Sequence, residues 1–202
     1  MDQKTLENLT GQIISRVFVP LEASGRHVHV TKEQALALFG HPLTPKRPLS
    51  QPGQYLANER LTIQTEKGAF RDVAVLGPER KEAQVEISLT DARVLGLTPP
   101  VRQSGDTKNS PGITLKGCRG SVYIPEGVIA ASRHIHLNPQ EAAIFGVKDR
   151  QIVSLQVYTK RPAIFQDVLV RVHPSFSAAV HLDYDEANGC GMKPGDLGRI
   201  LP

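Results

Sequence analysis

The segments Arg26-His27-Val28-His29 and Arg133-His134-Ile135-His136 repeat one pattern of arginine, histidine, apolar residue and histidine. On an extended strand, residues two apart point to the same face, and the residue between them points to the other face. Two imidazoles held on one face form a ready chelate for a borderline metal ion. Each segment therefore predicts a strand that carries a metal-binding pair.

The duplication extends into the residues after each pair, where an alanine-rich stretch ends in Phe-Gly. Thr31 followed by Gln34 is typical of a capping box, and Asn138 followed by Pro139 is typical of an N-cap with proline at the first helical position. Each copy is thus a strand followed by a short helix. Because the copies lie much farther apart than the period of a solenoid, we predict two related half-molecules.

The composition of the chain limits the classes of protein to which it can belong. The 202 residues carry a formal net charge of +4, aromatic residues make up only 5%, and no basic stripe with interleaved aromatics is visible. This pattern argues against a nucleic-acid-binding protein. No apolar run reaches the roughly 20 residues of a membrane span, and no secretory leader is apparent. We therefore expect a protein of a bacterial-type cytosol, or of a compartment filled from it.

The two cysteines, Cys118 and Cys190, are far apart and belong to no Cys-x-x-Cys motif. This spacing favours free thiols over a disulfide framework or a thiolate zinc site.

Most of the chain reads as short strands. An amphipathic helix is expected first, over residues 2–17, with Leu6, Leu9, Ile13 and Val17 on one face. Short β-branched runs separated by glycine and proline follow. These runs are residues 18–21, 61–65, 72–76, 84–89, 121–124, 152–158, 168–172 and 179–183. Many short strands with few helices predict barrels or sandwiches, and the duplication favours two small barrels.

Three further residues have two interpretations each. His181 alternates with acidic residues on a predicted strand. It is interpreted either as a metal ligand or as a hydrogen-bonded strand histidine. On another predicted strand, Glu86 points away from its apolar neighbours. It is interpreted either as a metal ligand or as an exposed glutamate. Arg80 follows a turn that could aim its guanidinium at a phosphate, and residue type and position alone favour an ordinary surface arginine.

A competing metal motif begins at the first histidine pair. His27, His29 and Glu33, followed by Gly40, resemble part of a cupin motif. Glu33 falls in the first turn of the predicted helix, however, where an acidic residue suits the helix dipole, whereas the cupin glutamate extends a strand.

The complete set of motifs resembles the phosphate propanoyltransferase family, the phosphotransacylases of bacterial microcompartments. The resemblance covers nearly everything from residue 18 to residue 202. Besides the two arginine-histidine units, the motifs that carry it are Val75-Leu76-Gly77-Pro78 before Arg80, Gln84-Val85-Glu86-Ile87-Ser88, Ser104-Gly105-Asp106, Ser110-Pro111-Gly112 and Asp185-Glu186-Ala187-Asn188.

The resemblance implies a mainly β fold of two small β-barrels with short capping helices and an active site between them. Residues 18–25 and 132–202 would form the first barrel, and residues 26–131 the second, with a lid-like insertion at about 41–58. Residues 1–17 would be an amphipathic N-terminal helix, which serves as an encapsulation peptide for microcompartment shell proteins or packs on its own barrel. A homo-oligomer is compatible with the family.

The resemblance also implies the site residues and two zinc ions per chain. His27, His29 and Glu86 would bind one zinc, and Arg80 would bind phosphate. The second zinc would be bound by His134, His136 and His181. Coenzyme A would contact Ala23, Ser24, Gly25, Lys67 and Asn188.

This chain departs from the family pattern at two places near the expected coenzyme A contacts. Family members often carry Gly-Val-Ser-Asn before the first Arg-His, where this chain has Glu22-Ala23-Ser24-Gly25. A basic residue often stands where this chain has Ala74.

The implied activity is reversible conversion of a short-chain acyl-CoA, propanoyl-CoA or acetyl-CoA, and phosphate to acyl phosphate and coenzyme A. Two alternatives come from other classes: a cupin-like metal oxygenase or isomerase, and a zinc-stabilised, non-catalytic module that binds acyl-CoA or shell proteins. The implied location is the bacterial cytoplasm, including the interior of a microcompartment.

Overall fold

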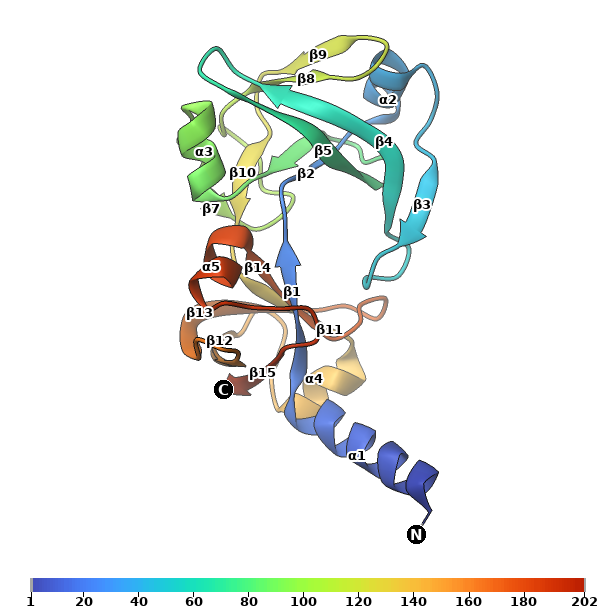
Figure 1. Cartoon of the computed structure of the whole chain (residues 1–202), viewed down its shortest axis with the longest axis vertical. Helices are drawn as coiled ribbons and strands as arrows, with labels where there is room; N and C mark the ends of the chain where they lie inside the picture. Colours follow the sequence, from blue (N-terminus) through green and yellow to red (C-terminus); the bar gives the residue numbers. More distant parts are fainter. Residues whose placement is uncertain (1, 202) are drawn as a thin grey trace. The chain divides into compact units, whose positions relative to one another are not determined.

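The computed structural model describes residues 2–201, and these residues form two compact units. Unit 1 comprises residues 2–24, 133–182 and 186–201, and unit 2 comprises residues 25–132 and 183–185. Both are built mainly from β-strands, which confirms the predicted mainly β class (Figure 1). No helix within residues 2–201 has the length and apolar character needed to cross a membrane.

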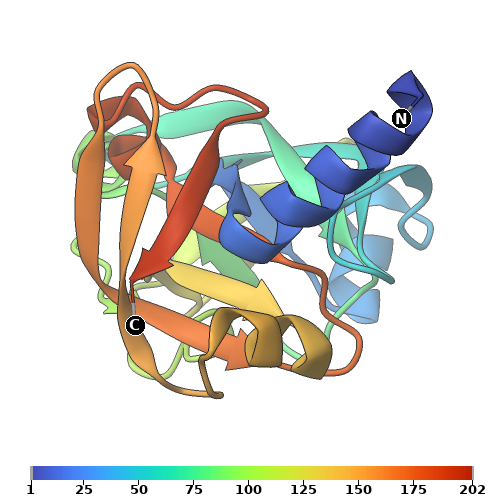
Figure 2. The ribbon, with the colours of Figure 1, turned by 90° about the horizontal axis from the view of Figure 1, so that it is seen from below.

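Unit 1 is a closed barrel of six strands in the order β1-β14-β11-β13-β12-β15 (Figures 1 and 2). These strands are β1 (Val19–Ser24), β11 (His134–Leu137), β12 (Ile152–Tyr158), β13 (Ala163–Val172), β14 (Ala179–Asp183) and β15 (Leu197–Leu201). The barrel has its own apolar core, in which Ile135, Leu155 and Leu182 are fully buried. Helices α4 (Pro139–Phe145) and α5 (Tyr184–Gly189) follow β11 and β14.

Unit 2 is a curled, open sheet with the strand order β7-β10-β6-β2-β5-β4-β8-β9, and β3 pairs with β4. Its strands are β2 (His27–His29), β3 (Pro45–Pro48), β4 (Tyr55–Gln64), β5 (Ala69–Gly77), β6 (Gln84–Glu86), β7 (Val101–Arg102), β8 (Ile113–Lys116), β9 (Ser121–Ile124) and β10 (Val128–Ala131). Helices α2 (Lys32–Phe39) and α3 (Leu89–Leu95) follow β2 and β6. A second apolar core includes Val28, Ile63 and Leu115. The expectation of two small barrels is therefore met by one closed barrel and one half-barrel sheet.

The duplicated sequence folds twice into the same local structure, a strand followed by a capped helix. In the first copy, Thr31 and Gln34 form a capping box at the start of α2, and in the second, Asn138 and Glu141 form one at the start of α4. Both helices end at a glycine in the left-handed conformation, which lacks the Cβ that makes this conformation costly. Both N-caps expected from the sequence are present.

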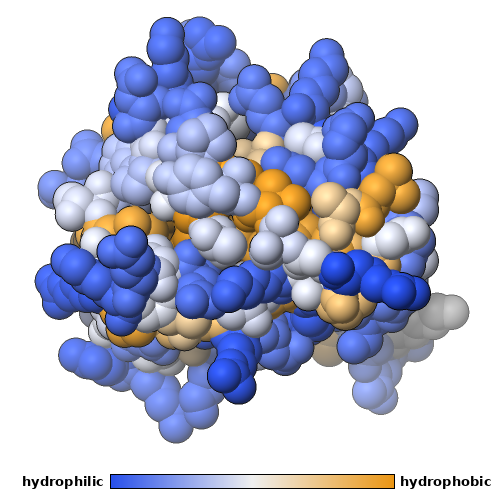
Figure 3. Space-filling view, turned by 90° about the horizontal axis from the view of Figure 1, so that it is seen from above, coloured by the Kyte–Doolittle hydropathy of each residue, from blue (hydrophilic) through white to orange (hydrophobic). Residues whose placement is uncertain are grey.

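The N-terminal helix α1 (Gln3–Val17) begins at the N-cap Asp2 and extends from the barrel of unit 1 (Figure 1). It contacts α4. Its apolar stripe is largely exposed, with Leu6 52%, Leu9 42% and Ile13 63% accessible. By contrast, the face of the molecule shown in Figure 3 is mainly hydrophilic, with smaller apolar patches.

The proline-rich segment at residues 41–58 is tied to the sheet of unit 2. Its residues Pro45–Pro48 form β3, which is exposed and pairs antiparallel with β4. At its start, the backbone N–H of Leu43 donates to Glu79, and that of Thr44 donates to Glu59. The segment therefore has regular hydrogen-bonded structure of its own.

We predict that the apolar residue between two histidines stabilises its strand. Ile135→Ala removes a fully buried side chain of unit 1 and should lower the free energy of unfolding by about 2–5 kcal/mol, through lost burial and the cavity left behind. Urea denaturation followed by circular dichroism measures this effect, because the chain has no tryptophan.

The matched control is Ile152→Ala on β12 of the same unit, where the side chain is 55% exposed. It should change the free energy of unfolding by no more than about 0.5 kcal/mol. Equal losses in the two variants would contradict the assigned role of Ile135.

Candidate functional site

The first histidine pair and a glutamate meet on one face of the sheet of unit 2. Strand β2 pairs antiparallel with β6, and this register sets His27 directly opposite Glu86. The candidate ligand atoms of His27, His29 and Glu86 all lie within 4.8 Å of one another, and all three residues are buried. Directly opposite residues in paired strands share a face, so the sheet itself assembles this group.

Backbone carbonyls orient both imidazoles of this group. The Nδ1 of His27 lies 2.8 Å from the carbonyl oxygen of Gly25, and the Nδ1 of His29 lies 3.1 Å from that of Leu76. A carbonyl oxygen can only accept a hydrogen bond, so each Nδ1 must carry the hydrogen. In the neutral form of each ring, Nε2 then carries the lone pair, which is the tautomer that a metal ligand needs.

The electrostatics of the group keep the carboxyl of Glu86 ionised. Burial alone would raise the pKa of Glu86, but His27, His29 and a hydrogen bond from Ser104 hold it well below its usual range. Burial likewise opposes a charge on His27, yet the nearby Glu86 carboxylate raises the pKa of His27 above its ordinary value. Burial, with the charges of His27 and Arg80, lowers the pKa of His29 well below its ordinary value.

The second group consists of three histidines of unit 1. Antiparallel pairing of β11 with β14 sets His134 directly opposite His181, and His136 lies two residues along β11. Their candidate ligand atoms also lie within 4.8 Å of one another. The carboxylate of Glu22 lies 3.9 Å from the Nδ1 of His181, and the ring of Phe176 lies 4.2 Å from that of His136.

Both groups fit a borderline divalent metal by the chemistry of their donors. One group offers two imidazole nitrogens and a carboxylate, and the other offers three imidazole nitrogens, which are combinations typical of zinc sites with an open position. His41 and His173 belong to neither group. Glu33, the glutamate of the cupin-like pattern, is exposed on α2, so Glu86 from a distant strand takes the place beside the first histidine pair.

Arg80 lies after β5 on a segment that is hydrogen-bonded to the residue following β2. Its backbone N–H donates to the carbonyl of Val30 at 2.9 Å, and its guanidinium donates a long hydrogen bond of 3.5 Å to the hydroxyl of Ser104. Its positive charge contributes to the lowered pKa of His29, so the guanidinium acts on the first histidine group. The structure thus brings Arg80 near His27, His29 and Glu86.

The arginine before each histidine pair braces its strand in the same way in both units. Arg26 makes two hydrogen bonds to Asp91, of 2.9 and 2.7 Å, and its guanidinium lies over the ring of Phe70. Arg133 pairs with Glu186 at 2.8 Å and lies over the ring of Phe165. These contacts explain why the repeated motif begins with arginine, although the sequence alone did not identify the acidic partners.

The expected coenzyme A contacts lie at three places. Ala23 and Ser24 end β1 of unit 1, while Gly25 belongs to unit 2. A Cβ at Gly25 would lie 2.7 Å from the ring of Tyr184, so a larger residue here would require that ring to move. Asn188 is exposed on α5.

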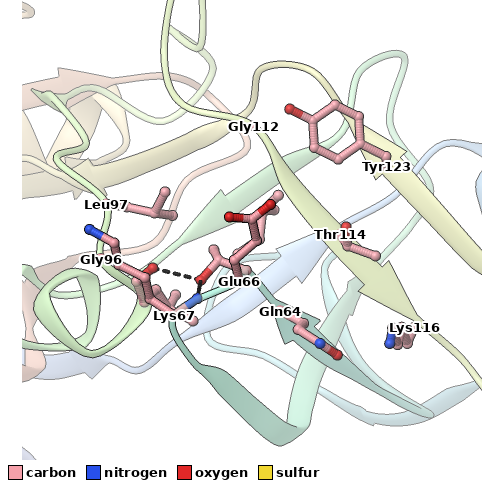
Figure 4. Close-up of a pocket in the computed structure, with 12 residues that line it drawn as sticks. Gln64, Glu66, Lys67, Gly96, Leu97, Gly112, Thr114, Lys116 and Tyr123 are labelled. Carbon is pink, nitrogen blue, oxygen red and sulfur yellow. Dashed lines mark hydrogen bonds between the residues drawn. The ribbon is translucent and has the colours of Figure 1, made fainter.

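Lys67, the remaining expected contact, lines a pocket of about 640 Å³ in unit 2. Figure 4 shows its walls: Glu66 and Lys67 come from the turn between β4 and β5, Leu97 follows α3, and Tyr123 comes from β9. The hydroxyl of Thr65 closes the turn, because it accepts from the backbone N–H of Lys67 and donates to the carbonyl of Leu95. The turn therefore presents Lys67 from a fixed backbone.

Comparison with known proteins identifies close relatives. Residues 20–193 match the family model described as phosphate propanoyltransferase. The chain is 49% identical to a phosphate propanoyltransferase of Enterococcus faecalis over 183 residues, which cover 90% of this chain and 87% of the relative. It is 51% identical to one of Thermotoga maritima over 181 residues (88% and 86%) and 47% identical to one of Listeria monocytogenes over 198 residues (97% and 93%).

Proposed function

The chain belongs to the phosphate propanoyltransferase family and is a phosphate acyltransferase, and on this premise we propose that it converts propanoyl-CoA and phosphate to propanoyl phosphate and coenzyme A, reversibly, with two bound zinc ions. The family match over residues 20–193 carries the proposal. The two histidine groups support its metal dependence.

The reaction brings several negative charges together. A phosphate oxygen attacks the thioester carbonyl carbon, a C–O bond forms, the C–S bond breaks, and coenzyme A leaves as a thiolate that takes up a proton. Cationic groups aimed at these oxygens and at the sulfur would lower the barrier. Arg80 is suited to binding phosphate, because a guanidinium makes two parallel hydrogen bonds to phosphate oxygens and stays charged.

We propose that His27, His29 and Glu86 hold one zinc and that His134, His136 and His181 hold the other. When bound, zinc supplies a Lewis acid that polarises a carbonyl or phosphate oxygen or stabilises a departing thiolate. The carbonyls of Gly25 and Leu76 keep the hydrogen on Nδ1 of His27 and His29, so that Nε2 of each ring is available as a ligand.

We propose that coenzyme A contacts Ala23, Ser24, Gly25, Lys67 and Asn188. Lys67 and Lys116 both line the pocket of Figure 4, and two ammonium groups suit the phosphates of coenzyme A. At Ala74, where family members often carry a basic residue, the strand register offers a substitute cation. Arg60 of β4 lies directly opposite Ala74. This face of the sheet therefore has a cation one strand away from the position where relatives often have one.

The function is tested by release of free coenzyme A from propanoyl-CoA, with and without phosphate. Release that requires phosphate and yields propanoyl phosphate is expected. Release that is independent of phosphate would contradict the proposal, and parallel reactions with acetyl-CoA measure the preference for the acyl chain.

Zinc content tests the two ligand groups separately. The wild-type chain should retain about two zinc ions after dialysis, and Glu86→Ala and His181→Ala should each retain about one, because each removes a ligand from a different group. Elemental analysis by mass spectrometry measures the zinc-to-protein ratio.

The control for these variants is His173→Ala, which changes a histidine outside both groups and should retain both ions. One iron or manganese per chain in the wild-type protein would instead favour the cupin-like alternative.

Phosphate kinetics test the role of Arg80. Arg80→Ala should raise the KM for phosphate about 10- to 100-fold, because charge-assisted hydrogen bonds to the anion are lost, and should leave the zinc content unchanged. Arg150→Ala, which removes a 91% exposed guanidinium, should leave the KM unchanged. Loss of zinc from the Arg80 variant, or an unchanged KM, would show that Arg80 has another role.

We further propose that α1 docks on microcompartment shell proteins through its exposed stripe of Leu6, Leu9 and Ile13. Fluorescent protein fused to residues 1–17 should then concentrate in assembled shells in cells. A fusion carrying Leu9→Lys and Ile13→Lys should stay diffuse, and diffuse wild-type fusion would rule out targeting by this helix.

A further inference from the structure

Gln84 is a buried polar residue beside the first histidine group. It begins β6, is only 2% exposed, and lies two residues before Glu86, so both side chains point to the same face of the sheet. Strand pairing sets it directly opposite His29. A side-chain amide in such a position has a high free-energy cost of burial unless all its polar atoms are hydrogen-bonded.

The amide of Gln84 makes three hydrogen bonds that together fix its orientation. Its Nε2 donates to Oε1 of Glu86 at 2.5 Å and to Oγ of Ser104 at 2.8 Å, and its Oε1 accepts from the backbone N–H of Gly105 at 2.6 Å. Rotating the amide by half a turn would set its oxygen against the Glu86 carboxylate and its N–H groups against the N–H of Gly105. Only one orientation satisfies all the partners.

These hydrogen bonds connect Glu86 with a loop of distant sequence. Ser104 and Gly105 follow β7 and line a polar pocket of about 710 Å³ in unit 2. The hydroxyl of Ser104 accepts from Gln84, contacts the guanidinium of Arg80, and lowers the pKa of Glu86 by hydrogen bonding. One glutamine side chain thus holds the loop at the point where it meets both Glu86 and Arg80.

We propose that Gln84 is a positioning residue: its amide fixes Ser104 and Gly105 and, through the Ser104 hydroxyl, holds the Arg80 guanidinium in place for the anionic substrate. The proposal rests on the phosphate-binding role of Arg80 proposed above. Gln84 itself touches no substrate in this assignment. Its effect should therefore appear in phosphate binding and in the order of the loop.

The first test is the phosphate kinetics of Gln84→Met, which keeps the length of the side chain and removes all three hydrogen bonds. The KM for phosphate should rise about tenfold, the equivalent of one lost hydrogen bond to a charged group, with a smaller change in kcat. Gln34→Met is the matched control, because it makes the same substitution at a glutamine of unit 2 whose amide oxygen accepts from the backbone N–H of Thr31 in the capping box of α2. An unchanged KM in Gln84→Met would overturn the proposal.

A double-mutant cycle shows whether Gln84 acts through Ser104. Ser104→Ala removes the connecting hydroxyl from a partly exposed loop and should raise the KM for phosphate by a similar factor. The variant with both substitutions should be no worse than Gln84→Met, since both remove the same connection. Effects that multiply would overturn the proposal, and so would an unchanged KM in Ser104→Ala, which remains decisive if Gln84→Met does not fold.

Amide hydrogen exchange gives a readout that does not depend on activity. The N–H of Gly105 should exchange at least tenfold faster in Gln84→Met than in the wild-type protein, and at the wild-type rate in Ser104→Ala and Gln34→Met. Unchanged exchange of Gly105 in Gln84→Met would overturn the positioning role. If wild-type protein lacks phosphate-dependent release of coenzyme A, the proposed function fails, whereas the exchange of Gly105 still decides whether Gln84 orders the loop.

Discussion

The arrangement of both histidine groups depends on the burial of one aliphatic residue between two imidazoles. Val28 and Ile135 are fully buried in the cores of units 2 and 1, respectively. Because neighbouring residues on a strand point to opposite faces, each anchored aliphatic side chain forces its two histidines to the other face together. A shift of one residue in strand register would expose the apolar residue and bury the imidazoles in the core, so the hydrophobic effect also sets the positions of the ligands.

The two groups differ in charge although they arise from the same duplicated motif. The group of unit 2 contains an ionised carboxylate, Glu86, held well below its usual pKa, whereas the group of unit 1 contains three histidines. A carboxylate offsets part of the charge of a bound divalent ion, while neutral imidazoles do not. The two proposed zinc ions would therefore differ in Lewis acidity, which suits a reaction whose partners are a phosphate dianion and an uncharged thioester carbonyl.

Local features of the structure could be predicted from the sequence, because they depend on residues close together in the chain. The N-caps at Thr31 and Asn138 and the alternation of the two histidine pairs follow from spacings of two or three residues. The same reasoning correctly separated Glu33 from the strand glutamate of a cupin, since Glu33 lies in the first turn of α2. The mainly β class likewise followed from many short β-branched runs.

Contacts between distant segments could not be predicted in this way. From spacing alone, His181 and Glu86 each kept two interpretations, and only the pairing of β14 with β11 and of β6 with β2 brings them beside the histidine pairs. Gln84 is a similar case: its motif contributed to the family resemblance, but its role depends on a loop about twenty residues away that its amide contacts directly.

By itself, therefore, the sequence determined the duplicated strand-and-helix units, the two histidine pairs, the mainly β class and the family resemblance. Each of these depends on alternation, capping or ordered motifs along the chain. Only the tertiary structure decided that unit 1 closes into a barrel while unit 2 remains a curled sheet, and which residues stand beside each histidine pair. The physical reason is that strand pairing and the filling of an apolar core are non-local, and no local pattern encodes which strands become neighbours.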